Sequence, residues 1–289
     1  MPKGTFNVLP GDLEAGAGLA EHLGAAKVTL IGSVSAGRAV MRSASATGKP
    51  VLLELGGKNA LIAYPDSDPK KIADAIVARM NFGWCGQSCG SISRAFLYED
   101  IHDEVISYLA ESVERYKPGV PTDPETTIGT IVSRAQFDRV MGFIDSAKSE
   151  GARAVTGGYA VTDSPLAKGS FIAPTIFADV TPQMRIAREE IHGPVLAVRK
   201  WSDEDSMLNE VNALELGLPC AIWTRDLVMA HRTAARVEAG FVWVNEVGRH
   251  FLGAPFGGVK QSGIGREVGI GELISFTYEK NVHINLSGQ

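Results

Sequence analysis

Short β-prone runs alternate with helical stretches along most of this chain, and that alternation limits the possible folds more than any other feature of the sequence. Strands are predicted at 27–31, 51–55, 95–98, 195–198, 221–224 and 241–244. Asp68 and Pro69 are predicted to begin a helix, because aspartate favours the N-cap and proline the first helical position. Strands that alternate with helices usually pair in parallel, so we expect an α/β fold.

The composition is that of an ordinary globular protein, with 45% hydrophobic and 21% charged residues among 289. A chain of this length can bury one large core or two smaller ones. The net charge of −5 gives no reason to expect nucleic acid or an anionic membrane as a partner. No apolar run reaches membrane-spanning length, and the first residues do not resemble a signal peptide. We therefore expect neither a nucleic-acid nor a membrane partner.

Three cysteines, Cys85, Cys89 and Cys220, are too few to form a disulfide framework. Their number suits the reducing cytoplasm, which is the predicted location, because cysteines there are more often reactive or buried than paired. The spacing of Cys85 and Cys89 permits either a disulfide or two free thiols. No second pair of cysteines or histidines completes a zinc site, so no metal is predicted.

Cys89 lies in a glycine-containing turn, after the helix that begins at Asp68 and before the strand at 95–98. Small neighbours leave room for a thiolate to attack a substrate, and backbone N–H groups of a turn stabilise the thiolate. Cys89 is therefore a candidate nucleophile. The alternative is a small buried residue without a chemical role.

Glu54 follows three apolar residues of a predicted strand and precedes Leu55, Gly56 and Gly57. Burial of a carboxylate is costly and raises its pKa, which suits a general base that activates water. The alternative is a glutamate at the end of a strand that faces solvent.

Gly32, Ser33 and Gly37 lie between a predicted strand and the helical stretch that follows it. Backbone N–H groups at such a turn can bind a phosphate. The spacing differs from the Gly-x-Gly-x-x-Gly fingerprint, so an ordinary capped turn is the alternative.

The order and spacing of several motifs add to these single residues. The motifs are ELGGKN at 54–59, GQSC at 86–89, GSVSAG at 32–37, EEIHGP at 189–194 and PFGGVKQSGIGRE at 255–267. Together they resemble the general-base, nucleophile and cofactor motifs of the NAD(P)-dependent aldehyde dehydrogenase superfamily. The resemblance extends over nearly the whole chain.

The resemblance implies an aldehyde-dehydrogenase-like fold in three parts. A partial Rossmann-type cofactor domain is expected at 1–55, an α/β catalytic domain at 56–276, and a terminal strand at 277–289 that pairs with a neighbouring subunit in a homo-oligomer. The family's N-terminal portion is expected to be missing. That portion contains the first strands of the cofactor domain, an amide that stabilises the oxyanion, and a lysine that holds the adenine-side ribose.

The resemblance also implies a two-step oxidation of an aldehyde, the expected small-molecule substrate. The Cys89 thiolate would attack the aldehyde to give a thiohemiacetal, and hydride would pass to NAD or NADP. Water activated by Glu54 would then hydrolyse the resulting thioester to a carboxylic acid.

Further site residues follow from the same resemblance. The cofactor-binding residues would be Gly32, Ser33, Gly37, Leu55, Gly56, Glu190 and His192. Glu190 would hold the nicotinamide-side ribose, and His192 stands where the family usually has phenylalanine. Phe256 and Trp84 would line the substrate channel. The loop from Gly248 to Ala254 would shape specificity.

Two other functions are consistent with the same residues. Cys89 and Glu54 could form a thiol esterase that needs no nicotinamide. Alternatively, the chain could be a truncated, catalytically impaired relative that acts as a non-catalytic subunit.

Overall fold

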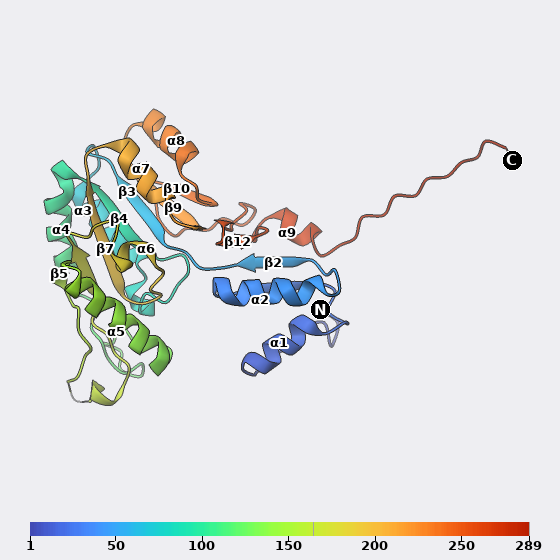
Figure 1. The fold of residues 1–289 in the computed structure, drawn as a ribbon, viewed down its shortest axis with the longest axis horizontal. Coiled ribbons are helices and arrows are strands. Elements are labelled where there is room, and N and C mark those ends of the chain that lie inside the picture. Colours follow the sequence, from blue (N-terminus) through green and yellow to red (C-terminus); the bar gives the residue numbers. More distant parts are fainter. Residues whose placement is uncertain (164, 289) are drawn as a thin grey trace.

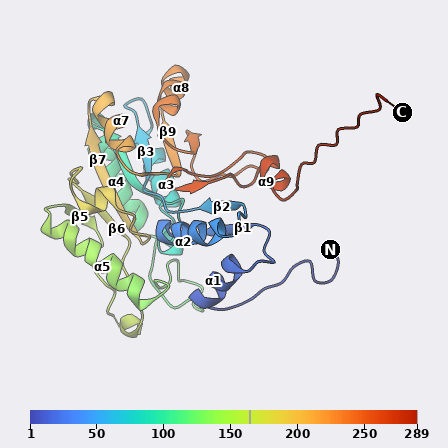
Figure 2. The ribbon, with the colours of Figure 1, turned by 45° about the vertical axis from the view of Figure 1, so that its right-hand side comes forward.

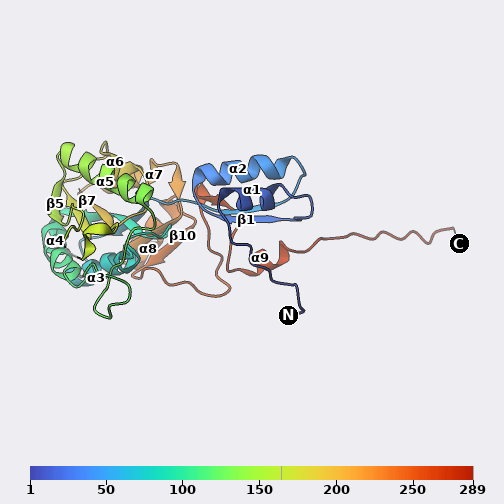
Figure 3. The same cartoon turned by 90° about the horizontal axis from the view of Figure 1, so that it is seen from below.

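The described residues form a seven-stranded sheet (the large sheet), a three-stranded sheet (the small sheet) and a two-stranded sheet, and the two larger sheets organise the ribbon of Figure 1. The computed structural model describes residues 1–163 and 165–288. In the small sheet, β1 (Val28–Ile31) pairs in parallel with β2 (Val51–Glu54), and β12 (Gly263–Ile264) adds antiparallel to β2. Figure 3 shows this sheet, with α1 (Leu13–Glu21) and α2 (Val34–Ser45), beside the larger part of the molecule.

The large sheet has seven strands in the order β10-β9-β3-β4-β7-β6-β5. Its strands are β3 (Asn59–Ala63), β4 (Ile92–Tyr98), β5 (Arg153–Thr156), β6 (Thr175–Ala178), β7 (Val195–Trp201), β9 (Pro219–Trp223) and β10 (Phe241–Val244). All of its neighbouring pairs are parallel except β5 with β6. The predicted α/β fold with a parallel sheet is therefore confirmed, and each of the six strands predicted between residues 27 and 244 overlaps an observed one.

Helices cover both faces of the large sheet (Figure 1). They are α3 (Pro69–Arg79), α4 (Glu99–Val113), α5 (Arg134–Ser149), α6 (Arg185–Arg188), α7 (Glu204–Asn212) and α8 (Leu227–Arg236). Side chains alternate along β3, so that Leu61 and Ala63 pack in the core under α3 and α4, whereas Ala60 and Ile62 pack in the core under α7. Asp68 caps α3 as predicted, because its carboxylate accepts a hydrogen bond of 3.1 Å from the Lys71 N–H.

The glycine-rich stretch from 251 to 271 differs from the long loop that its sequence suggests. It contains β12 and also β11 (Val259–Lys260), which pairs antiparallel with β8 (Leu216–Gly217), and it leads into α9 (Ile270–Ile274). β12 thus returns to the small sheet, and the expected division into a cofactor domain at 1–55 and a catalytic domain at 56–276 stays a prediction. Backbone pairing across a long sequence separation causes this return, which local composition does not reveal.

The end of the chain leaves the rest of the molecule as an extended segment (Figure 2). Residues 277–288 are exposed and form no ladder with the other described residues. The expected terminal strand that pairs with a neighbouring subunit stays a prediction, and residue 289 lies outside the described part. Across that part, the helices are too short or too polar to cross a bilayer.

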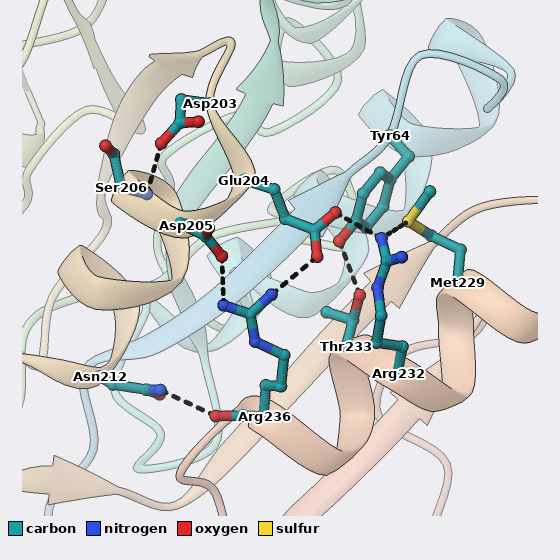
Figure 4. Close-up of polar contacts among 10 residues, drawn as sticks. All are labelled: Tyr64, Asp203, Glu204, Asp205, Ser206, Asn212, Met229, Arg232, Thr233 and Arg236. Atoms are coloured by element: carbon teal, nitrogen blue, oxygen red, sulfur yellow. Dashed lines mark hydrogen bonds and ion pairs between the residues drawn. The ribbon is translucent and has the colours of Figure 1, made fainter.

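Polar contacts join α7 to α8, as Figure 4 shows. Glu204 accepts hydrogen bonds from Arg232 at 2.7 Å and from Arg236 at 3.1 Å. The Tyr64 and Thr233 hydroxyls lie 2.6 Å apart, and both side chains are buried. Exposed ion pairs contribute little to stability, whereas a buried hydroxyl that loses its partner is costly.

This contrast gives a test of the packing of α8. Replacement Tyr64→Phe should lower the free energy of unfolding by about 1–3 kcal/mol, because the Thr233 hydroxyl would stay buried without a partner. The double variant with Thr233→Val should recover part of that loss. Glu204→Gln should cost less than about 1 kcal/mol. Urea unfolding measures all three, and a larger loss for Glu204→Gln than for Tyr64→Phe would contradict the assignment.

Candidate active site

The loop between α3 and β4 holds Cys89 in a fixed position. The Asn59 side-chain amide donates hydrogen bonds to the Cys89 carbonyl at 2.7 Å and to the Ser91 carbonyl at 2.8 Å. Gly86 has a φ of +63°, and a Cβ there would lie 2.2 Å from the Gly193 carbonyl oxygen. A tight glycine turn and a buried amide therefore seat the loop against its neighbours.

A cavity of about 1210 Å³ opens beside this loop and extends to the turn between β1 and α2. Predicted site residues that line it are Gly32, Ser33, Gly56, Trp84, Cys89, Glu190 and His192. The structure therefore brings together residues from the small sheet, from the Cys89 loop and from the segment after α6. Of these, Trp84 is 68% exposed.

Four predicted residues do not line this cavity, namely Glu54, Leu55, Gly37 and Phe256. A Cβ on Gly37 would lie 2.6 Å from the Leu55 side chain, so this glycine lets α2 pack closely on the end of β2. Phe256 belongs to an aromatic cluster of Phe241, Trp243, His250 and Phe256, where its ring lies 4.6 Å from His250 and 5.4 Å from Phe241. The positions of these four residues do not test the roles predicted for them, which stay predictions.

Glu190 lies directly against the two glycines that follow β2. Its carboxylate accepts a hydrogen bond of 3.3 Å from the Gly57 N–H. A Cβ on Gly56 would lie 2.0 Å from Glu190 Oε2, so this close approach requires glycine. Burial raises the pKa of Glu190, while the Gly57 N–H, His192 and Lys58 oppose that rise.

Glu54 is a buried carboxyl group without a hydrogen-bond partner. It is 3% exposed, and neither carboxylate oxygen has a partner among the described residues. Burial raises its pKa to about 7, with a further contribution from Glu267, and Arg266 opposes the shift. The alternative of a glutamate that faces solvent is therefore wrong. Near neutral pH, this group can either hold or accept a proton.

The three cysteines are free thiols with different surroundings. Cys85 and Cys220 are buried, and burial raises their pKa to about 11 and about 12. Cys89 is half-buried and lines the cavity. Burial, followed by the negative charges of Glu190 and Glu54, raises the pKa of Cys89. A base or a cation must therefore help to form its thiolate.

Sequence reasoning missed several residues that hold the cavity wall in place. Gln136 donates to the Ile191 and His192 carbonyls, both at 2.9 Å, and Arg139 donates to the Glu190 carbonyl at 2.6 Å. Both lie on α5 and line the cavity. Their three-residue spacing places them on one side of a helix, which was the available signal. Asn59 gave a weaker signal, as a polar residue at the start of a buried strand.

Metal ligation is the remaining chemistry to consider. Within residues 1–163 and 165–288, no group of three or more histidine, cysteine, aspartate or glutamate side chains is arranged to hold an ion.

Comparison with known proteins shows which family the chain belongs to. Residues 1–282 match the model of the aldehyde dehydrogenase family. The aldehyde dehydrogenase tropH of Talaromyces stipitatus is 52% identical over 292 aligned residues, which cover all of this chain and 57% of that protein.

Solved structures agree with this match. A putative aldehyde dehydrogenase from Burkholderia cenocepacia has a TM-score of 0.90 at 37% identity, over 95% of this chain and 56% of that one. The NAD⁺ complex of aldehyde dehydrogenase from Bacillus cereus has a TM-score of 0.88 at 35% identity, over 94% of this chain and 55% of that one. The chain thus spans about half the length of these relatives. By sequence and by structure, it belongs to the aldehyde dehydrogenase family.

Proposed function

We propose that this chain takes part in the NAD(P)-dependent oxidation of an aldehyde to a carboxylic acid, with Cys89 as the nucleophile and Glu54 as the general base. The observation that carries the proposal is that Cys89 and Glu190 line the same cavity, and that the buried Glu54, whose pKa is raised to about 7, lies close enough for its charge to act on the Cys89 thiol. A reactive thiol and a base that is half-protonated near neutral pH suit a reaction in two proton-transfer steps.

The cavity fits a dinucleotide. Gly32 and Ser33 form the turn at the start of α2, where backbone N–H groups and the helix dipole favour a phosphate. Glu190 and His192 lie at the Cys89 end, where they would hold the nicotinamide side. The Bacillus cereus relative was solved as an NAD⁺ complex, which supports this cofactor class. When bound, NAD or NADP would accept the hydride.

The residues of the chain supply the remaining steps. The Cys89 thiol gives its proton to solvent water, and a lone pair of Sγ then attacks the aldehyde carbon, so that a C–S bond forms while the C=O π pair moves onto oxygen and a tetrahedral thiohemiacetal results. Its backbone N–H could supply half of an oxyanion hole. After oxidation to the thioester, the Glu54 carboxylate accepts a proton from water, the hydroxide oxygen attacks the acyl carbon, and Cys89 leaves as the thiolate.

Assembly and location follow from other observations. Apolar side chains of the last 20 residues are exposed, including Leu273 at 66% and Phe276 at 60%. We infer that α9 and the extended segment pack against a second copy of the chain in a homo-oligomer. The free state of all three cysteines supports the cytoplasm as the location.

Loss of the thiol tests the proposed reaction. Cys89→Ala should abolish aldehyde-dependent formation of NAD(P)H, whereas the buried Cys85→Ala should retain it, because only the first thiol lines the cavity among the three cysteines. Absorbance at the reduced-nicotinamide band measures both variants. Folded wild-type protein that binds neither NAD nor NADP would identify a non-catalytic subunit. Turnover of an activated ester without any reduction of nicotinamide would identify an esterase.

A second test concerns the base. Glu54→Gln should slow thioester hydrolysis by about 10²–10⁴-fold, so that acyl-Cys89 accumulates and is visible by intact-protein mass. In the wild type, hydrolysis should accelerate as pH rises through about 7, because only the carboxylate accepts a proton. A pH profile that is unchanged in Glu54→Gln would exclude this role.

The same variant has a built-in control for folding. The pKa of Glu54 is raised in the folded protein, so its ionisation destabilises the fold as pH increases from about 4.5 to about 7. Glu54→Gln removes that penalty, and its Tm at pH 8 should be at least that of the wild type. A lower Tm would show that the lost activity reflects misfolding.

The close contact between Gly56 and Glu190 leads to a prediction of how a substitution at Gly56 changes the affinity for the cofactor. Gly56→Ala places a methyl group against the Glu190 carboxylate and should raise the Kd for NAD(P) by about tenfold or more, the effect of losing one charged hydrogen bond. Gly142→Ala on α5 meets open space and should leave the Kd unchanged. Quenching of tryptophan fluorescence measures both. Equal Kd values for the two variants would contradict the assigned contact.

A further inference from the structure

Arg79, the last residue of α3, points its guanidinium toward the Cys89 loop. A Cβ on Gly90, the residue after the nucleophile, would lie 2.5 Å from Arg79 Nη2. On the other side, a Cβ on Gly248 would lie 2.9 Å from Arg79 Nη1. The guanidinium therefore sits between the nucleophile loop and the loop that begins at Gly248, and side chains at either glycine would displace it.

This guanidinium has no anionic partner in the described part of the chain. Arg79 is half-buried, forms no salt bridge or hydrogen bond there, and its Nε is buried without an acceptor. Two other arginines that are buried or half-buried do have hydrogen-bond partners. Arg94 donates to the carbonyls of Lys58 and Val211, and Arg199 binds both carboxylate oxygens of Glu210 at 2.7 Å. A partly desolvated cation without a partner is costly, so its retention beside a nucleophile points to a ligand.

The surroundings of Arg79 indicate the chemical class of that ligand. Its guanidinium carbon lies 5.2 Å from the ring of Trp243, which belongs to the aromatic cluster. Its charge also contributes to the lowered pKa of His250, after burial, so the imidazole of that cluster lies close to the same charge. A cation at the edge of an aromatic wall suits a molecule with an apolar body and one anionic end.

We propose that Arg79 binds the carboxylate of the substrate, so that the aldehyde is an oxo acid whose carbon skeleton packs on the aromatic cluster. This inference rests on the proposed dehydrogenase reaction. A guanidinium matches a planar carboxylate through two parallel hydrogen bonds. Bound in this way, the carboxylate is held next to the Gly90 backbone, and the aldehyde end of a short oxo acid reaches Cys89.

A competing role is stabilisation of the nucleophile itself. The positive charge of Arg79 opposes the rise in the pKa of Cys89, so its removal would lower the thiolate population. That effect is the same for every electrophile. Recognition of a carboxylate, in contrast, changes the ratio between an anionic reagent and a neutral one of the same size.

Alkylation of Cys89 separates the two roles and needs no dehydrogenase activity. Iodoacetate carries a carboxylate, and iodoacetamide is its neutral counterpart. The ratio of their rates at Cys89, followed by peptide mass spectrometry with Cys89→Ser as the blank, should fall by about tenfold or more in Arg79→Gln. Arg79→Lys should retain part of the ratio. Arg153→Gln removes an arginine of β5 that pairs with Asp179, and this control should leave the ratio of the two rates unchanged.

The matching kinetic experiment uses 4-oxobutanoate and its methyl ester. The ratio of their kcat/KM values should favour the acid in the wild type and fall in parallel with the alkylation ratio in Arg79→Gln. Arg79→Gln could instead lower kcat/KM equally for the acid and the ester, and lower the alkylation rate equally for both reagents. That result would overturn the proposal in favour of thiolate stabilisation. A wild type without preference for the charged reagent would also overturn it. A preference in alkylation without any NAD(P)H formation would sustain the carboxylate site and refute the dehydrogenase reaction instead.

Discussion

The short passage from Glu54 to Asn59, which joins the small sheet to the large one, is the constraint on which the site depends. Glu54 ends β2, and Asn59 begins β3 while its amide holds the Cys89 carbonyl. Between them, Gly56 passes so close to Glu190 that even a methyl group would collide with the carboxylate. One stretch of backbone therefore contacts or contains Glu54, the Cys89 loop and Glu190, the three groups to which the proposed reaction assigns the base, the nucleophile and the ribose contact.

Buried polar groups without partners gather along this passage and beside it. The carboxylate of Glu54, the ammonium of Lys58 and Nε of Arg79 all lack a partner in the described part of the chain. Burial moves the pKa of both Glu54 and Lys58 to about 7, from opposite directions. Such groups reduce stability, and the rest of the core offsets their cost with apolar packing and with satisfied buried polar groups such as Arg94.

Local pattern was sufficient for the elements whose signal is local. Apolar runs located β1, β2, β4, β7, β9 and β10, and the capping preference of Asp68 located α3, whereas β3, β5 and β6 were not predicted. The return of 263–264 to the small sheet was not predictable, because it depends on pairing with residues about 210 positions earlier, at Leu53 and Glu54. Motif order made Glu54 and Cys89 the candidate base and nucleophile, roles that stay predictions, and the structure places Cys89 at the cavity and Glu54 in a buried position outside its lining. Their supporting contacts, which include the amide of Asn59, became visible only when the loops were brought together in space.

Cys89 stands between two kinds of surface, and they come from different parts of the chain. On one side is the polar cavity, built by the turn before α2 and the segment after α6. On the other is the aromatic cluster with Arg79, built by α3, by β10 and by the loop after it. Residues that would hold the cofactor and residues that would select the substrate therefore share no element except the nucleophile loop. Because they are separate, the proposed reaction implies that substitutions around Gly248 would change the accepted aldehyde without disturbing the passage from Glu54 to Asn59.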